Sequence, residues 1–170
     1  MRTLLLLRHA KSSWDDDRRD DHERPLAPRG VRAAALVGAY LAEESRAPDL
    51  VLCSAARRAV ETWERAAAVL PRAPRLVLDE ALYLASPEQI LARVRRVEDR
   101  VARLLVVGHN PGFQQLALEL AGGAASAEAR RIGKFPTGAL ASFTLARAGW
   151  SELAPGRVRL ADFVRPADLV

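Results

Sequence analysis

The stretch TLLLLRHA, residues 3–10, decides how this chain folds. Its four consecutive leucines form a short apolar run, and such a run is typical of a strand that is buried inside a sheet. The apolar run stops at the charged and polar pair Arg8-His9. The sequence therefore predicts a buried strand over Thr3–Leu7 that delivers an arginine and a histidine directly at its end.

Strand-like and helix-like segments alternate along the rest of the chain. After a charged loop over Trp14–Pro28, further strands are predicted over Leu50–Cys53, Arg75–Leu78, Leu104–Val107, Ala139–Arg147 and Arg157–Val164, and helices over Gly30–Glu44, Ala55–Leu70, Pro87–Asp99 and Phe113–Ala121. This alternation predicts an α/β fold: a three-layer α/β/α sandwich with a mostly parallel central sheet. The late strands allow an antiparallel edge.

Length and composition fit one globular domain over residues 1–170. The chain is 49% hydrophobic and 28% charged, and aromatic residues make up only 5%, so the core must consist largely of leucine, valine and alanine. No apolar run is long enough to span a bilayer, and Cys53 is the only cysteine, which excludes an intrachain disulfide. We therefore expect a cytoplasmic monomer that does not bind membranes.

The formal net charge of +5 suggests acidic partners such as phosphorylated molecules. Nucleic acid is not the favoured partner, because a general bias in composition explains the many arginines. Arginine stands in place of lysine almost everywhere in this alanine- and leucine-rich sequence. Lys11 and Lys134 are the only lysines. This pattern indicates a general bias in composition, with many arginines on solvated helix faces.

Polar side chains follow each of the three clearest buried strands. After the first strand stand Arg8, His9 and Lys11; after the second, Ser54, Arg57 and Arg58; and after the third, Gly108, His109 and Asn110. In open α/β sheets ligands bind beyond the carboxyl ends of the strands. The sequence therefore predicts one pocket that holds two histidines and several cations.

This set of residues suits phosphoryl transfer. A neutral imidazole is a good nucleophile toward phosphorus, and guanidinium groups match phosphoryl oxygens with paired hydrogen bonds. A zinc site built on His9 and His109 is the competing interpretation, but it needs a further carboxylate or thiolate ligand. Cys53 lies inside a predicted strand, and the chain has no HxH or HExxH spacing, so we expect no metal.

Four ordered segments carry a family resemblance: LLLLRHAKSSW (4–14), CSAARRAVET (53–62), VVGHNPG (106–112) and KFPTGALASF (134–143). The first resembles the RHG motif of the histidine phosphatase superfamily, with Ala10 in place of the glycine. RHAKS followed by RPLAPRG resembles the SixA-like branch of phosphohistidine phosphatases. The resemblance covers nearly the whole chain and implies a phosphoglycerate mutase-like fold and no cofactor.

The resemblance implies a role for each matching residue. His9 matches the nucleophile that takes the phosphoryl group, and Arg8 matches the first phosphate-binding arginine. Arg58 matches the second arginine through the pattern S-x-x-x-R-A-x-x-T, with Arg57 as the neighbouring alternative. His109 matches the second histidine of the pocket. Lys11 and Asn110 stand beside these residues and are expected to contact the substrate.

A general acid is harder to place. Glu80, after the strand over Arg75–Leu78, is the best positional candidate, and Asp79 is the second. Phosphohistidine does not need a strong acid, because its leaving imidazole has a near-neutral pKa.

Local roles are also expected for four other side chains. Ser54 is expected to cap the following helix, Arg24 to anchor the loop and His22 to be a solvated loop residue. Trp14 either packs the loop or contacts the substrate.

The sequence thus predicts a metal-independent phosphatase that works through a phosphohistidine intermediate on His9. A phosphorylated protein carrying phosphohistidine is the favoured substrate, since no long insertion is present to cover a small molecule. The alternatives are a phosphatase of a small-molecule phosphate ester and a non-catalytic phosphate-binding module. Retention of two histidines argues against the last, because arginines alone suffice for binding.

Overall fold

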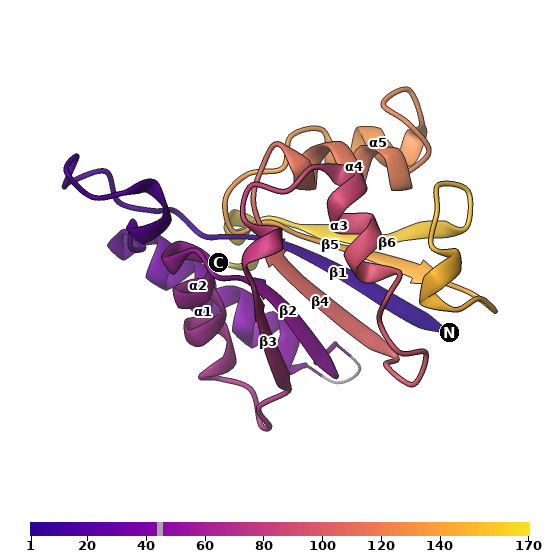
Figure 1. The fold of residues 1–170 in the computed structure, drawn as a ribbon, viewed down its shortest axis with the longest axis horizontal. Coiled ribbons are helices and arrows are strands. Elements are labelled where there is room, and N and C mark those ends of the chain that lie inside the picture. Colours follow the sequence, from indigo (N-terminus) through magenta and orange to yellow (C-terminus); the bar gives the residue numbers. More distant parts are fainter. Residues whose placement is uncertain (44–45) are drawn as a thin grey trace.

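The computed structural model describes residues 1–43 and 46–170 of the chain, and its centre is a six-stranded sheet in the order β3-β2-β4-β1-β5-β6 (Figure 1). The strands are β1 Arg2–Arg8, β2 Leu50–Ser54, β3 Arg75–Asp79, β4 Arg103–Gly108, β5 Leu140–Leu145 and β6 Val158–Val164. The first strand of the sequence thus lies near the middle of the sheet, between β4 and β5.

The sheet is mostly parallel, which confirms the prediction. β1, β2, β3 and β4 run parallel, whereas β5 pairs antiparallel with both β1 and β6. The antiparallel strand therefore lies inside the sheet rather than at its edge. A parallel neighbour needs a crossover connection, and a helix does precede each of β2, β3 and β4.

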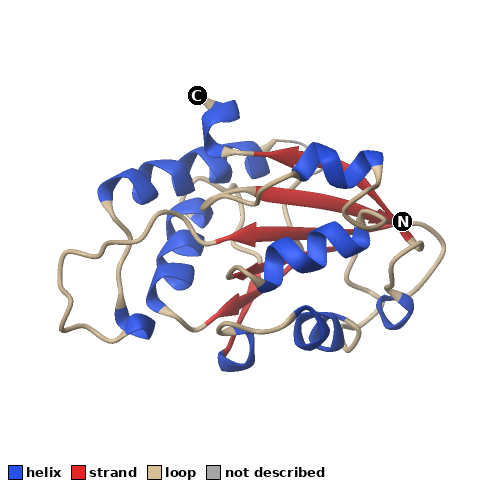
Figure 2. Cartoon of the chain, turned by 90° about the horizontal axis from the view of Figure 1, so that it is seen from above, coloured by secondary structure: helices blue, strands red, loops and turns tan. Residues whose placement is uncertain are grey.

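Helices cover both faces of the sheet (Figures 1 and 2). The helices are α1 Pro28–Ala42, α2 Arg57–Ala67, α3 Pro87–Val94, α4 Gly112–Leu120 and α5 Ala127–Ile132, with short 3₁₀ turns at 21–23, 80–82, 150–152 and 166–169. α1 and α2 lie on one face, and α3, α4 and α5 lie on the other. Within the described part of the chain, every helix falls short of the length and apolarity that a membrane crossing requires.

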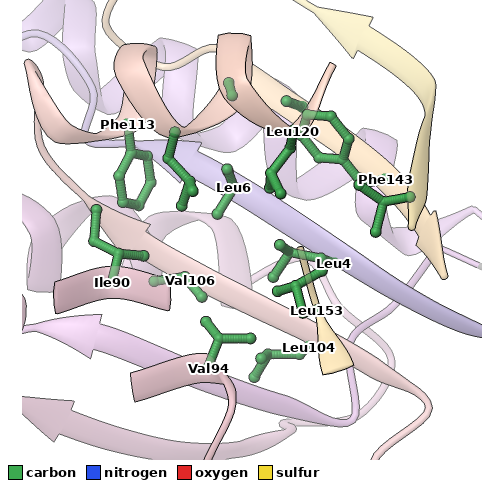
Figure 3. Packing of buried hydrophobic residues seen from close by; sticks show 14 of the residues in the cluster. Leu4, Leu6, Ile90, Val94, Leu104, Val106, Phe113, Leu120, Phe143 and Leu153 are labelled. Carbon is green, nitrogen blue, oxygen red and sulfur yellow. The ribbon is translucent and has the colours of Figure 1, made fainter. Parts of the chain in front are cut away.

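Alternate residues of each buried strand belong to two hydrophobic clusters, one on each face of the sheet. Leu4 and Leu6 of β1 pack with Val106 of β4 and Phe113 of α4, as Figure 3 shows. Leu5 and Leu7 of the same strand enter the other cluster, beneath α1 and α2. Every leucine in this run is at most 3% exposed, so the four consecutive leucines are explained by burial on both faces of the sheet.

The ends of several elements differ from the prediction. α1 begins at Pro28 rather than Gly30, since proline is well suited to the first helical position. Its predicted last residue, Glu44, lies outside the described residues. α2 and α3 end earlier than predicted, because turns follow Ala67 and Val94. The N-cap Ser86 and the first helical residue Pro87 of α3 are confirmed. The short helix α5 was not predicted.

Gly30 places the first turn of α1 against the backbone that follows β1. A Cβ atom at this position would lie 2.1 Å from the carbonyl oxygen of Lys11, a backbone atom that has little room to move. We expect Gly30→Ala to lower the free energy of unfolding by about 1–3 kcal/mol, the usual cost of overpacking. Urea denaturation would measure this. The exposed neighbour provides the control Arg29→Ala, and equal stability of the two variants would contradict the prediction.

Candidate active site

The carboxyl ends of β1, β4 and β2 meet at one edge of the sheet. Arg8 is paired with Gly108, and the backbone N–H of His9 donates to the Gly108 carbonyl at 3.0 Å. The structure thereby brings the predicted site residues, apart from the candidate acids Glu80 and Asp79, to one pocket of about 210 Å³. It is lined by Arg8, His9, Lys11, Ser12, Trp14, Arg24, Arg58, Leu84, His109, Asn110 and Thr137.

His9 is held in one tautomer by its own chain. Its Nδ1 lies 2.7 Å from the carbonyl oxygen of Ala10, and the ring is buried, with 5% exposed. A carbonyl oxygen only accepts hydrogen bonds, so Nδ1 carries the proton. The lone pair of the neutral ring therefore lies on Nε2, which is the nitrogen required for nucleophilic attack.

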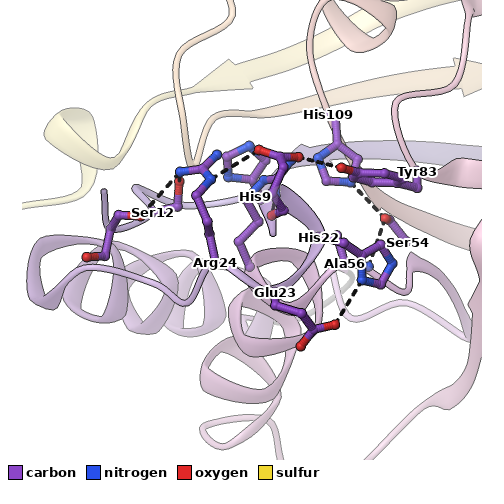
Figure 4. A network of polar contacts seen from close by, with 12 residues as sticks. His9, Ser12, His22, Glu23, Arg24, Ser54, Ala56, Tyr83 and His109 are labelled. Atoms are coloured by element: carbon purple, nitrogen blue, oxygen red, sulfur yellow. Dashed lines mark hydrogen bonds and ion pairs between the residues drawn. The ribbon is translucent and has the colours of Figure 1, made fainter. Parts of the chain in front are cut away.

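His109 faces His9, with the two ring centroids 5.3 Å apart (Figure 4). Its Nε2 lies 2.7 Å from the Oγ of Ser54, which also accepts a hydrogen bond from the backbone N–H of Ala56 at 3.3 Å. We assign the hydroxyl proton of Ser54 to the bond with Nε2, which puts the ring proton of His109 on Nδ1. The prediction that Ser54 caps the following helix is wrong, because the N-cap of α2 is Ala56. Ser54 instead orients the ring of His109.

Both histidines are neutral at physiological pH. Burial, followed by the nearby guanidinium charges of Arg58 and Arg8, lowers the pKa of His9 to about 3. Burial also lowers the pKa of His109 to about 3, and the neighbouring His9 and Arg58 act in the same direction. The lone pair on His9 Nε2 is therefore free at neutral pH without prior deprotonation.

These pKa values predict how stability depends on pH. An unfolded chain protonates each histidine near the ordinary pKa of 6.5, whereas the folded chain keeps both rings neutral until about 3. The unfolded chain then binds more protons, so we expect the free energy of unfolding to fall on acidification below 6.5. The slope approaches about 1.4 kcal/mol per pH unit for each histidine.

Urea unfolding of wild type and of the variants His9→Asn and His109→Asn, measured from pH 7.5 to 4.5, would test this slope. Each variant is expected to lose one histidine's share of the slope, and parallel profiles for all three proteins would contradict it. His22 is present in all three proteins, so its contribution cancels when their profiles are compared. Hydrogen bonds to Glu23 and Glu80 raise the pKa of His22, so its contribution is present below 6.5 and is lost at higher pH.

Arg58, rather than Arg57, points into the pocket. Arg58 is 3% exposed and donates to the backbone oxygen of Asp21 at 2.7 Å and to its Oδ2 at 3.0 Å. Arg57 lies on the outer surface of α2, where it pairs with Glu61 at 3.1 Å. Arg8, the other predicted phosphate ligand, donates to the carbonyl oxygen of Phe135 at 3.0 Å.

Three buried side-chain nitrogens of the described residues have no hydrogen-bond partner: Arg8 Nε, Arg58 Nε and His109 Nδ1. Buried polar groups in proteins are nearly always paired, so each exception requires an explanation. All three belong to residues that line this pocket: Arg8 ends β1, His109 follows β4, and Arg58 lies in the first turn of α2. The fold thus leaves donors unsatisfied at the position where an anion with several oxygens would satisfy them.

Asp21 and Tyr83 complete the wall behind Arg58 and were not predicted. The Oδ2 of Asp21 accepts hydrogen bonds from Arg58 and from the Tyr83 hydroxyl, and its Oδ1 accepts from Arg24. Burial alone raises the pKa of Asp21, but the hydrogen bonds from Tyr83 and Arg58 outweigh this and lower it to about 2. The ring of Tyr83 stands edge-on to His109, with the centroids 5.5 Å apart.

Arg24 anchors the loop, as predicted, and also lines the pocket. It is 7% exposed, and its guanidinium donates to Asp21 and to the Ser12 Oγ at 2.7 Å. Thr62 links α2 to the segment after β1. Its hydroxyl donates a hydrogen bond to the Arg58 carbonyl and accepts one from the backbone N–H of Ala10. This bond holds α2 to the segment that carries His9.

The remaining predicted residues divide between pocket and surface. Lys11 and Asn110 line the pocket, although the Asn110 side chain is already bonded to Phe135 and Gln114.

Glu80 and Asp79 lie outside the residues that line the pocket. Glu80 contacts His22 at 3.0 Å, while Asp79 pairs with Arg93 at 2.8 Å. His22 is therefore not a freely solvated loop residue: it lies in a 3₁₀ turn between Glu23 and Glu80.

Comparisons with known proteins agree with this geometry. Residues 4–83 match the family model of the histidine phosphatase superfamily, branch 1. A solved structure from Nakamurella multipartitia, assigned as the phosphohistidine phosphatase SixA, is 30% identical and superposes with a TM-score of 0.86 over 97% of this chain and 96% of its own. A SixA-assigned structure from Agrobacterium tumefaciens is 26% identical, with a TM-score of 0.83 over 97% and 98% of the two chains.

An uncharacterized protein of Mycobacterium tuberculosis is 42% identical over 163 residues, which are 94% of this chain and 99% of the relative. The fold, the matched residues and the paired histidines together place this chain in the histidine phosphatase superfamily. Within that superfamily of phosphatases it belongs to the SixA-like branch.

Proposed function

We propose that this phosphatase removes phosphate from phosphohistidine in a protein, through a phosphorylated intermediate on His9 and without a metal. The observation that carries the proposal is the set of three unpartnered buried nitrogens beside a neutral His9 whose lone pair lies on Nε2. They provide hydrogen-bond donors for phosphoryl oxygens next to a nucleophile, which is the arrangement that phosphoryl transfer requires.

The first step transfers the phosphoryl group to the enzyme. The lone pair on His9 Nε2 attacks phosphorus while the bond between phosphorus and the substrate imidazole nitrogen breaks. The substrate ring takes a proton from solvent on its other nitrogen before the bond breaks, so the electron pair of the broken bond stays on the leaving nitrogen and the ring departs as neutral imidazole. Arg8, Arg58 and His109 supply N–H donors to the equatorial oxygens, where negative charge is spread in the transition state.

The second step returns the enzyme to its starting state. Water attacks phosphorus and loses a proton, the bond from phosphorus to Nε2 breaks, and its electron pair returns to the nitrogen of His9. The hydrogen bond from Nδ1 to the Ala10 carbonyl stabilises the positive charge that the phosphorylated ring carries before this step. One proton is taken up and one is released over the cycle, so the net reaction is hydrolysis.

The choice of substrate rests on the acidic residues. None of the described residues that line the pocket is an aspartate or a glutamate, and Asp21, with a pKa of about 2, is ionised at neutral pH. An alkoxide leaving group depends on an acid for protonation, whereas an imidazole leaves at a near-neutral pKa. The pocket therefore favours a phosphoramidate over an alkyl phosphate ester.

Two substrate assays test this proposal. We expect kcat/KM for a phosphohistidine peptide to exceed that for an alkyl phosphate monoester by about 10²-fold or more, the usual contribution of a missing general acid. Comparable turnover of both substrates would favour a small-molecule phosphate ester. We also expect full activity in excess chelator, and its loss would show that a metal takes part.

A further inference from the structure

Two exposed apolar side chains stand at the rim of the pocket that holds His9. Trp14 is 68% exposed and Leu84 is 53% exposed, and both line this pocket. Side chains of these types are mostly buried in folded proteins, and the floor of this pocket is charged. They come from separate segments, Trp14 from the loop after β1 and Leu84 from the turn after residues 80–82. The loop and the turn thus bring apolar surface to a phosphate site.

The Trp14 ring is fixed from one side only. The guanidinium carbon of Arg24 lies 3.5 Å from its ring centroid, within the range of a cation–π contact. Arg24 is itself immobilised by a hydrogen bond to Asp21. A second hydrogen bond, to Ser12, is drawn in Figure 4. Because one ring face is covered and most of the side chain is still exposed, the other face is available for stacking. Trp14 is therefore an ordered aromatic surface beside the pocket.

Leu84 is held at the rim at a conformational cost. Its φ angle is +50°, in the left-handed region that L-residues with large side chains rarely adopt. Both neighbours are constrained, since Ala85 is buried and Tyr83 is hydrogen-bonded to Asp21. Backbone strain of this kind is concentrated at ligand-binding sites. Here it turns an apolar side chain outward, beside the pocket, instead of into the core.

We propose that Trp14 and Leu84 bind the aromatic ring of the group that leaves phosphorus, and so select substrates in which the phosphoryl group is attached to such a ring. The inference rests on the proposed function and adds a specificity determinant to it. Stacking on Trp14 and apolar contact with Leu84 would hold an imidazole ring in place while its phosphoryl group enters the pocket of cations. A phosphoramidate without a ring makes neither contact.

The test compares phosphohistidine with inorganic phosphoramidate, two substrates whose phosphorus–nitrogen bonds break in the same chemistry. The variants are Trp14→Ala, Trp14→Phe and Leu84→Asn; asparagine is chosen because it tolerates a positive φ. We expect Trp14→Ala and Leu84→Asn to lower kcat/KM for phosphohistidine by about tenfold, the usual effect of one lost aromatic or apolar contact. Both variants should hydrolyse phosphoramidate within about twofold of wild type, and Trp14→Phe should keep most of the activity toward phosphohistidine.

The outcomes separate the inference from the proposed function. Equal losses on both substrates would show that the two residues only support the pocket, and would overturn the inference while leaving the function intact. Unchanged kcat/KM for phosphohistidine in both variants would overturn it as well. Wild type that hydrolyses phosphoramidate but not phosphohistidine would refute the proposed substrate and the inference together. Thermal denaturation of each variant checks that the fold is retained.

Discussion

His9→Ala is expected to lower kcat for phosphohistidine hydrolysis by about 10⁴-fold or more, which is the scale on which enzymes lose activity with their nucleophile. The variant keeps Arg8, Arg58 and His109 and so should still bind phosphate. We therefore expect inorganic phosphate to bind this variant with an affinity within a few fold of wild type. The combination of lost turnover and retained binding separates a nucleophile from a residue that only binds the anion.

A labelling experiment gives the direct readout for His9. Wild type incubated with ³²P-labelled phosphohistidine substrate and quenched in alkali should carry a label that is stable to base and labile to acid. His9→Ala should carry none, while His109→Ala should still be labelled, although more slowly. Label on His9→Ala would show that His9 is not the nucleophile.

Arg58→Ala should have the second largest effect, a loss of about 10²–10³-fold in kcat/KM, the usual cost of removing one preorganised donor to a developing charge. Its neighbour provides a matched control. Arg57→Ala removes the same kind of side chain one position away, on the exposed face of α2, and should change kcat/KM by less than about threefold. Arg58→Lys should recover only part of the activity, because an ammonium group cannot reproduce the planar fork.

The Arg58 variants also need a stability measurement. Arg58 holds Asp21 through two hydrogen bonds, so its loss leaves Asp21 with fewer partners. Thermal denaturation will show how much of an activity loss reflects unfolding. If Arg57→Ala proved as damaging as Arg58→Ala at equal stability, the assignment of the second phosphate ligand would be wrong.

Much of the fold could be predicted because its strongest signals are local. The leucine run of β1 and the Ser86–Pro87 start of α3 each follow from neighbouring residues. The short helix α5 was missed although Ser126 caps it and Gly133 ends it, because the alanine-rich sequence between them gives little periodic contrast. The convergence of His9 and His109 followed from a general property of parallel sheets.

The rest of the site depends on contacts between distant segments. Asp21 meets Arg58 and Tyr83 across 37 and 62 positions of sequence, so no local pattern marks it. Glu80 was chosen because it follows a strand, yet its carboxylate contacts His22, whereas Leu84, four residues further on, lines the pocket. Strand order and side-chain direction were not readable from the alternation of elements, and both decide which residues share a pocket.

The position of β4 between β1 and β2 also has a consequence for how the chain acquires its activity. β1 is made first, but its two neighbours in the sheet are β4, with Thr3 opposite Arg103, and β5, with Thr3 opposite Thr144. During synthesis the strand that leads to His9 therefore stays without either neighbour until most of the chain has been made. Such long-range pairing is typical of slow folding. It implies that His9 and His109 come together late in folding, when β4 pairs with β1.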